Sequence, residues 1–159
     1  YFDRVVIMAY DEHYRGGSTA GHTASLDWVQ AGIELFLNNG VRRDQLLLGV
    51  PFYTRLWKTD KDGNAVLNSN GNASSRTVWM RDLPDWLNKS PMRSVNDPQA
   101  GTLRYDLTLD DGNYSVWQED ESTMQKRFEL AKGYDLQGVA AWRLGFEPAS
   151  LWNKLATWK

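Results

Sequence analysis

The chain carries unbroken apolar runs separated by amphipathic and polar stretches. The apolar runs occupy residues 5–8, 46–52 and 138–144. Runs without alternation are typical of strands that are buried on both faces, usually in a parallel sheet. The pattern therefore predicts a buried strand at each of these places.

Amphipathic stretches at helical spacing lie between and after the apolar runs. Residues 25–40 start at a candidate N-cap, Ser25 or Asp27, and end in Asn-Asn-Gly, a helix stop signal. Residues 122–133 start with Ser-Thr-Met-Gln, which predicts a capping box. Pro148 predicts the first turn of a further helix, whose apolar face comprises Leu151, Trp152, Leu155 and Trp158.

The middle of the chain, residues 58–117, breaks this rhythm. Asp-Gly-Asn turns at 62–64 and 111–113 are flanked by strand-like residues and predict hairpins. We expect a short helix over residues 78–88 and a polar loop over 68–75. We interpret this segment as a small α+β insertion.

The elements thus fall into three parts: a βαβ part over residues 1–57, the insertion over 58–117 and a closing αβα part over 118–159. Parallel strands joined by right-handed crossovers leave both edges of the sheet open. Because open edges on apolar strands promote aggregation, we expect the missing strands of a closed barrel to lie in another segment or chain. If the chain folds alone, its open edges are expected to pair with another copy.

Composition narrows the function classes. The chain has 159 residues, a net charge of −2, two histidines and no cysteine. Disulfides and Cys-bound zinc are excluded, and two histidines are too few for an obvious metal site. Nucleic acid is not expected as a partner because basic residues do not cluster, and no apolar run approaches the roughly 20 residues that cross a bilayer. The 8 Trp, 7 Tyr and 5 Phe residues indicate a Trp-rich core or a surface that stacks on sugars.

Chemically active side chains follow the first apolar run. They are Tyr10, Asp11, Glu12 and His13. In α/β barrels the C-terminal ends of the strands carry the catalytic groups. A phenol, two carboxylates and an imidazole at such an end predict one wall of an active site.

Three motifs resemble those of glycoside hydrolase family 18, the chitinase-like family. Residues 8–11, Met-Ala-Tyr-Asp, resemble the end of that family's sixth strand, residues 48–55 resemble its seventh-strand motif, and residues 138–142 resemble its eighth strand. Tyr-Asp-Glu-His at 10–13 resembles the bacterial spore-cortex and cell-wall branch. The resemblance implies an α/β fold: the C-terminal part of a TIM (β/α)8 barrel, equivalent to strands 6–8, with a small α+β insertion.

The same resemblance implies roles for residues at the strand ends. Tyr10 and Asp11 match catalytic-site residues that hold the substrate's acetamide group. Met8 matches a residue packed beneath the sugar, and Trp142 matches the floor of the subsite. Arg55 has the alternative role of an ion-pair partner, with Asp11 as its candidate. The expected substrate-binding residues are Met8, Tyr53, Arg55, Trp57, Trp117, Glu119 and Trp142.

The family's catalytic acid has no counterpart in the sequence, because no stretch matches Asp-x-x-Asp-x-Asp-x-Glu. We therefore expect a fragment, inactive alone, of a glycosidase that cleaves β-1,4-linked, N-acetylglucosamine-containing polysaccharide, either peptidoglycan or chitin, by substrate-assisted retaining catalysis. The resemblance implies no metal or organic cofactor, because the nucleophile belongs to the substrate. Such a protein would be secreted, cell-wall or spore-associated. The alternatives are a non-catalytic chitinase-like lectin and an unrelated small α/β interaction domain. Glu12 and His13 are interpreted as solvated loop side chains.

Overall fold

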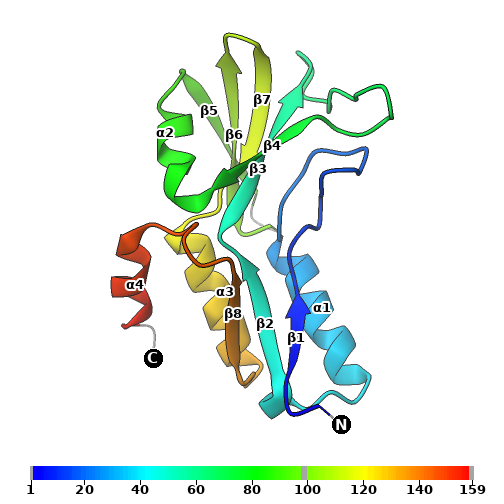
Figure 1. Cartoon of the computed structure of the whole chain (residues 1–159), viewed down its shortest axis with the longest axis vertical. Helices are drawn as coiled ribbons and strands as arrows, with labels where there is room; N and C mark the ends of the chain where they lie inside the picture. Colours follow the sequence, from blue (N-terminus) through cyan, green and yellow to red (C-terminus); the bar gives the residue numbers. More distant parts are fainter. Residues whose placement is uncertain (1, 98–99, 158–159) are drawn as a thin grey trace.

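Two β-sheets follow one another along the long axis of the molecule (Figure 1). The structure is a computed structural model, which describes residues 2–97 and 100–157. The chain passes directly from one sheet to the other, because only Phe52 separates the last strand residue of the first sheet from the first strand residue of the second.

The first sheet contains the three predicted strands. They are β1 (Val5–Met8), β2 (Leu46–Pro51) and β8 (Gly138–Trp142), in the order β1-β2-β8 and all parallel. A single turn of 3-10 helix, Arg43–Gln45, leads into β2. The prediction of a parallel βαβ arrangement is thus confirmed for the described residues, although β8 ends two residues earlier than the apolar run.

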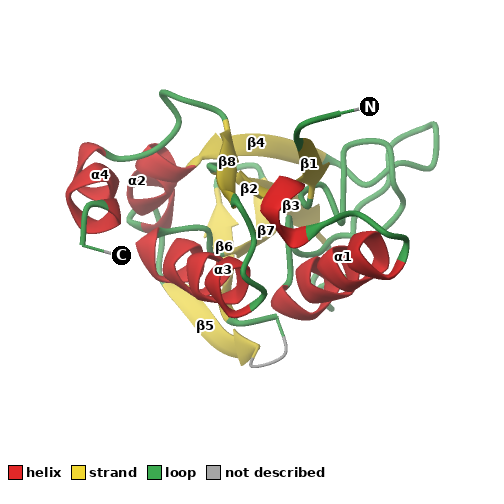
Figure 2. Cartoon of the chain, turned by 90° about the horizontal axis from the view of Figure 1, so that it is seen from below, coloured by secondary structure: helices red, strands yellow, loops and turns green. Residues whose placement is uncertain are grey.

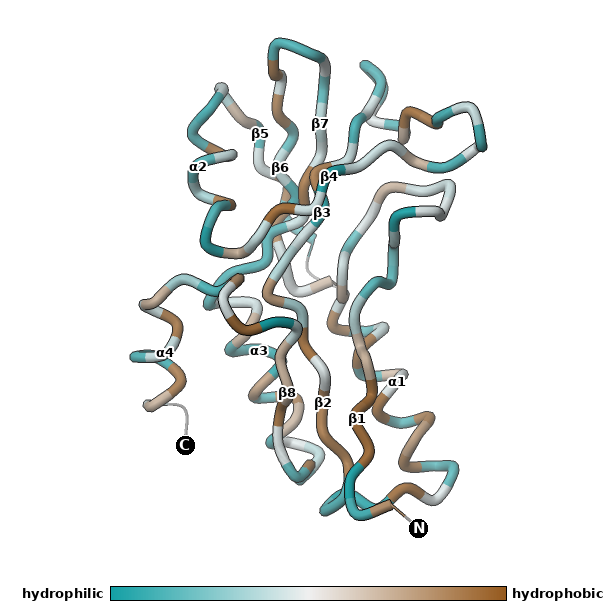
Figure 3. Tube along the Cα trace, in the orientation of Figure 1, coloured by the Kyte–Doolittle hydropathy of each residue, from teal (hydrophilic) through white to brown (hydrophobic). Residues whose placement is uncertain are grey.

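Helices α1 (Leu26–Asn38) and α3 (Glu121–Gly133) cover one face of this sheet (Figure 2). The apolar colouring of β1 and β2 in Figure 3 follows from their uninterrupted aliphatic residues.

Helix α4 (Ala149–Leu155) packs through Leu151 at the side of the same core. Trp158, predicted on the apolar face of α4, lies outside the described residues. The core between sheet and helices includes Ile7, Val29, Ile33, Leu46, Leu48, Val50, Met124, Ala131 and Leu151.

The opposite face of the first sheet is open. The side chains of Val6 and Met8 on β1 and of Trp142 on β8 are exposed, Met8 by 71% and Trp142 by 53%. The prediction that the first strand is buried on both faces is therefore wrong for this chain. The physical reason is that the strand's side chains alternate between faces, and α1 and α3 cover only one of them.

The predicted capping box of α3 is displaced by two residues. Asp120, not Ser122, is the N-cap: its Oδ1 accepts hydrogen bonds from the backbone N–H groups of Ser122 and Thr123. Thr123 Oγ1 accepts in return from the Asp120 N–H at 2.9 Å. The negative charge of the Asp120 carboxylate also interacts favourably with the positive end of the helix dipole. The helix therefore starts earlier than the Ser-Thr-Met-Gln pattern predicted.

The second sheet is antiparallel, with strand order β4-β3-β7-β6-β5. Its strands are β3 (Tyr53–Thr59), β4 (Ser75–Trp79), β5 (Met92–Asp97), β6 (Thr102–Leu109) and β7 (Gly112–Trp117). The sheet begins at Tyr53, inside the segment that the sequence pattern assigned to the first βαβ part. Its core includes Leu56, Val78, Leu107, Tyr114 and Val116.

Both Asp-Gly-Asn turns close antiparallel pairs. The second joins β6 to β7, and Gly112 has a φ of 134°, a conformation that L side chains rarely adopt. In the first, the Asp60 carboxylate accepts the N–H groups of Asp62 and Asn64, and a bridge between Thr59 and Ala65 follows. These side-chain bonds to nearby backbone are the usual reason that Asp starts a turn.

The short helix of the insertion is smaller than predicted. Helix α2 covers Leu83–Leu87, and a 3-10 turn, Met80–Asp82, precedes it. Val78 belongs to β4, which also begins within the predicted polar loop. No helix in the described part of the chain is long and apolar enough to cross a membrane.

The chain produced alone is expected to self-associate through β1 and β8, which are the edge strands of the first sheet. Light scattering at rising concentration would detect species larger than a monomer. Val6→Lys, which places a charge on exposed β1, should reduce this association, whereas Leu35→Lys on the exposed side of α1 should not. A monomer at every concentration would contradict the prediction.

Candidate functional site

The site is built around Asp11, which follows β1 at the carboxyl edge of the first sheet. The Tyr53 hydroxyl donates a hydrogen bond to Asp11 Oδ1 at 2.6 Å, and Arg55 Nη2 donates to the same oxygen at 2.7 Å. Tyr53 and Arg55 are two residues apart on β3 and therefore point to the same face of that strand. The second sheet thus supplies both groups that hold the carboxylate at the edge of the first.

Asp11 has a backbone conformation that needs such support. Its φ is 62°, in the left-handed region that few residues other than glycine adopt, although aspartate is enriched there. The two hydrogen bonds fix the carboxylate while 41% of the side chain remains exposed. The carboxylate is therefore both oriented by the protein and accessible from outside.

Tyr53 and Arg55 both donate hydrogen bonds to Asp11. Both residues are buried, Arg55 to 8% exposure. The alternative that Arg55 is the ion-pair partner of Asp11 is confirmed. Burial, reinforced by the hydrogen bond to Asp11, raises the pKa of Tyr53, so its phenol stays protonated and remains a donor to the carboxylate.

Tyr10 lies beside this group with its ring over Gly49. Its ring meets that of Tyr53 edge to face, with centroids 6.4 Å apart. Burial, followed by the neighbouring charge of Asp11, raises the pKa of Tyr10. Its hydroxyl has no hydrogen-bond partner among residues 2–97 and 100–157, so it is available as a donor to a ligand.

Gly49 on β2 is a residue of the site that the motif reasoning did not single out. A Cβ at this position would lie 3.2 Å from Tyr10 Cε1 and 2.5 Å from the Ile7 carbonyl oxygen. The side chain of any other residue would displace the Tyr10 ring. The signal was present in the sequence, since a lone glycine within an apolar strand often marks a close approach.

Met8 and Trp142 lie on the open face of the sheet, on its two outer strands. In the strand register Met8 is level with Gly49 and Ala140, and Trp142 is level with Pro51. The exposed Trp142 ring therefore stands at the same carboxyl edge as the site around Asp11. An exposed indole at such an edge is suited to stack on the apolar face of a ring.

The flanking contacts predicted at Trp57 and Glu119 are corrected by the structure. Trp57 is fully buried, and its Nε1 donates to the Gly21 carbonyl at 2.9 Å, so its ring cannot face a sugar. Glu119 is 2% exposed, and both its oxygens are bound by Arg127. Trp117 is half-buried, with its ring 5.1 Å from that of His22.

The fold and site together define an α/β protein with a polar and aromatic site at the carboxyl edge of parallel strands. A model of Glycosyl hydrolases family 18 matches residues 1–147. The chain belongs to glycoside hydrolase family 18.

Three similar proteins illustrate this membership. The uncharacterized glycosylase YvbX of Bacillus subtilis (strain 168) is 27% identical over 156 residues, covering 98% of this chain and 42% of that relative. The Bacillus cereus spore cortex-lytic enzyme SleL has a TM-score of 0.82 and 22% identity over 97% of this chain and 34% of that one. A family GH18 chitinase from Cycas revoluta, in complex with (GlcNAc)3, has a TM-score of 0.75 and 21% identity over 98% of this chain and 46% of that one. The chain spans less than half the length of each.

Proposed function

We propose that this chain forms the C-terminal part of the barrel of a family 18 glycosidase, equivalent to strands 6–8. The proposed enzyme cleaves β-1,4-linked polysaccharide that contains N-acetylglucosamine. The observation that carries the proposal is the arrangement at the sheet edge: an oriented but accessible Asp11, a protonated Tyr10 with a free hydroxyl, and an exposed Trp142.

The proposed chemistry is substrate-assisted and retaining, as in family 18 generally. The carbonyl oxygen of the substrate's own 2-acetamido group attacks the anomeric carbon and the glycosidic bond breaks. A protonated glutamate, supplied by a part of the protein outside these 159 residues, gives its proton to the leaving oxygen. Water then attacks the anomeric carbon from the face that the leaving group occupied. The bond between that carbon and the acetamide oxygen breaks, the glutamate takes back a proton from the water, and the configuration is retained.

In this scheme the chain's own residues hold the nucleophile in place. The Tyr10 hydroxyl donates a hydrogen bond to the acetamide oxygen, and Asp11 stabilises the positive charge that develops as the ring forms. Tyr53 and Arg55 are positioning residues, since they act through Asp11. Trp142 supports the apolar face of the sugar, and exposed Met8 packs beside it.

The relatives support the proposed substrate class. YvbX is described as a glycosylase and SleL as spore cortex-lytic, while the Cycas revoluta chitinase holds a GlcNAc oligomer. We propose a peptidoglycan or chitin substrate and a secreted, cell-wall or spore-associated site of action.

Tyr10→Phe in the protein that carries this chain is expected to lower kcat/KM by about 10²-fold, the effect of losing one hydrogen bond to a charge that develops in the transition state. The measurement is hydrolysis of a chromogenic chitobioside. Tyr105→Phe, a matched loss of one hydroxyl from a half-buried tyrosine of β6, serves as the control. Equal activities of the two variants would refute the role given to Tyr10.

A further inference from the structure

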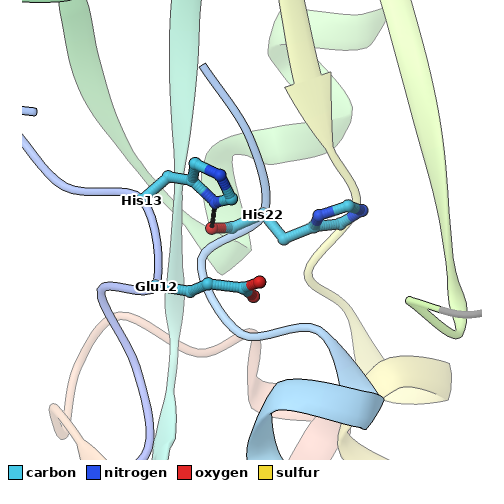
Figure 4. A group of neighbouring side chains, drawn as sticks. All are labelled: Glu12, His13 and His22. Atoms are coloured by element: carbon cyan, nitrogen blue, oxygen red, sulfur yellow. Dashed lines mark hydrogen bonds between the residues drawn. The ribbon is translucent and has the colours of Figure 1, made fainter. Parts of the chain in front are cut away.

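Three side chains outside the proposed catalytic group converge on one point. Glu12, His13 and His22 each place one possible ligand atom within 4.8 Å of the others (Figure 4). Glu12 and His13 follow the catalytic motif at the end of β1, while His22 comes from the returning arm of the next loop. We expected no metal site from the sequence because the chain has only two histidines.

Backbone pairing brings the two arms of this loop together. The Glu12 N–H donates to the Thr23 carbonyl at 3.0 Å, and the His13 N–H donates to the His22 carbonyl at 3.1 Å. The loop between them is therefore closed at its base, which fixes the separation of the two imidazoles.

Each imidazole is held by a hydrogen-bonding partner at one ring nitrogen. His13 Nδ1 lies 3.0 Å from the His22 carbonyl oxygen, and His22 Nε2 lies 3.1 Å from Asp97 Oδ2 on β5. Metal-binding histidines almost always donate their second ring N–H to a carbonyl or a carboxylate in this way. For His22 this partner is Asp97. His13 instead contacts the His22 carbonyl through Nδ1, the ring nitrogen that lies nearer Glu12 in Figure 4, so an ion bound at this nitrogen would replace that contact.

The position of the His13 ring depends on Gly21. A Cβ at Gly21 would lie 2.5 Å from two atoms of that ring. Gly21 is not among the glycines with positive φ, so its backbone conformation does not itself demand glycine. The Gly21 carbonyl is in turn bound by the buried Trp57 indole, so the backbone under the ring is held in place.

Glu12 completes the group with a carboxylate of which only one oxygen accepts a hydrogen bond. One oxygen accepts the Ser25 N–H at 2.7 Å, at the start of α1. Its other oxygen makes no hydrogen bond within residues 2–97 and 100–157, and Figure 4 shows the carboxylate pointing toward the two imidazoles. Two imidazoles and one carboxylate form a donor set that zinc uses in proteins.

We propose that Glu12, His13 and His22 bind a divalent transition-metal ion, with Zn²⁺ as the best fit. Ligand atoms on a tetrahedral zinc ion lie roughly 3.4 Å apart, from bond lengths of about 2.1 Å. Side-chain rotations must bring the three groups to this spacing from their present limit of 4.8 Å, and His13 must exchange its contact with the His22 carbonyl for the ion. Three protein ligands leave the fourth position open to water or another ligand, and the ion ties the loop to the end of β1.

Calorimetric titration of the protein that carries this chain with ZnCl2 tests the proposal. We expect saturable binding, a melting temperature that rises with zinc concentration, and visible absorption typical of a tetrahedral site when Co²⁺ replaces Zn²⁺. His22→Ala and Glu12→Gln should abolish or strongly weaken binding, and Asp97→Asn should weaken it about 10–100-fold. Glu129→Gln, an exposed substitution on α3, is the matched control and should bind zinc like the parent.

Glu12→Gln and Asp97→Asn keep the shape of the side chains, so a folded variant is available even if His22→Ala fails to fold. Circular dichroism of each metal-free variant checks the fold. The proposal is overturned if the parent shows no saturable binding, or if binding is unchanged in Glu12→Gln and Asp97→Asn. That result would leave the three side chains as hydrogen-bonding braces of the loop.

Discussion

The 159-residue chain, purified alone, is expected to release no product from a chromogenic chitobioside. Its sequence contains no match to the Asp-x-x-Asp-x-Asp-x-Glu motif whose glutamate protonates the leaving group in this family. General acid catalysis alone contributes about 10²–10⁴-fold to such reactions, and the acetamide-holding residues cannot replace it. The assay compares equal concentrations of the chain and of the full protein from which it comes.

Two further measurements are needed to interpret a lack of activity. Circular dichroism establishes that the chain is folded before its activity is judged. The full protein should hydrolyse the substrate if its upstream glutamate is intact, whereas binding of GlcNAc oligomers without hydrolysis would identify a chitinase-like lectin. Turnover by the 159-residue chain would refute the assignment of the acid to another segment.

Arg127→Met is expected to destabilise the protein by about 3–5 kcal/mol, the usual cost of removing one partner from a buried ion pair. Arg127 Nη1 and Nη2 donate to Glu119 at 2.6 and 2.7 Å, and Nη2 also donates to the Ala24 carbonyl. The side chains of Arg127 and Glu119 are 2% and 3% exposed. Without the guanidinium, the carboxylate loses its charged partner where water cannot reach it.

Urea denaturation followed by tryptophan fluorescence measures this loss. Arg93→Met, which removes an exposed guanidinium from β5, is the matched control and should change the free energy of unfolding by less than about 0.5 kcal/mol. The double variant Glu119→Leu/Arg127→Met should recover much of the stability, because it leaves no unpaired charge. A loss below about 1 kcal/mol in Arg127→Met would show that the pair is not desolvated.

The parallel strands could be predicted because each is encoded by a local run of apolar residues. The ion pair of Asp11 with Arg55 could also be predicted from the sequence, because both residues follow apolar runs that were expected to form neighbouring strands. The burial of Glu119 could not be predicted. Its partner, Arg127, lies on the following helix, and nothing in the local sequence pattern distinguishes a paired carboxylate from a solvated one. The same limit applies to His22, whose partner Asp97 is 75 residues away in sequence.

The exposed Met8 and Trp142 show a different limit. Their strands read as buried on both faces, and the pattern records the environment for which the residues were selected. In this chain the helices cover only one side, so the other side of the pattern has no partner among the described residues. The uninterrupted apolar residues of β1 are therefore what a strand covered on both faces would carry, whereas the structure leaves Val6 and Met8 exposed.

The direct passage from β2 to β3 has a consequence for protein engineering. Segments inserted into a barrel are often treated as cassettes that can be exchanged between relatives. Here β3 carries Tyr53 and Arg55, and it is held on its two sides by β4 and β7. A graft that replaced residues 58–117 would keep both side chains but remove the strands that align them. The surroundings of the Asp11 carboxylate and the grafted segment would therefore have to be redesigned together.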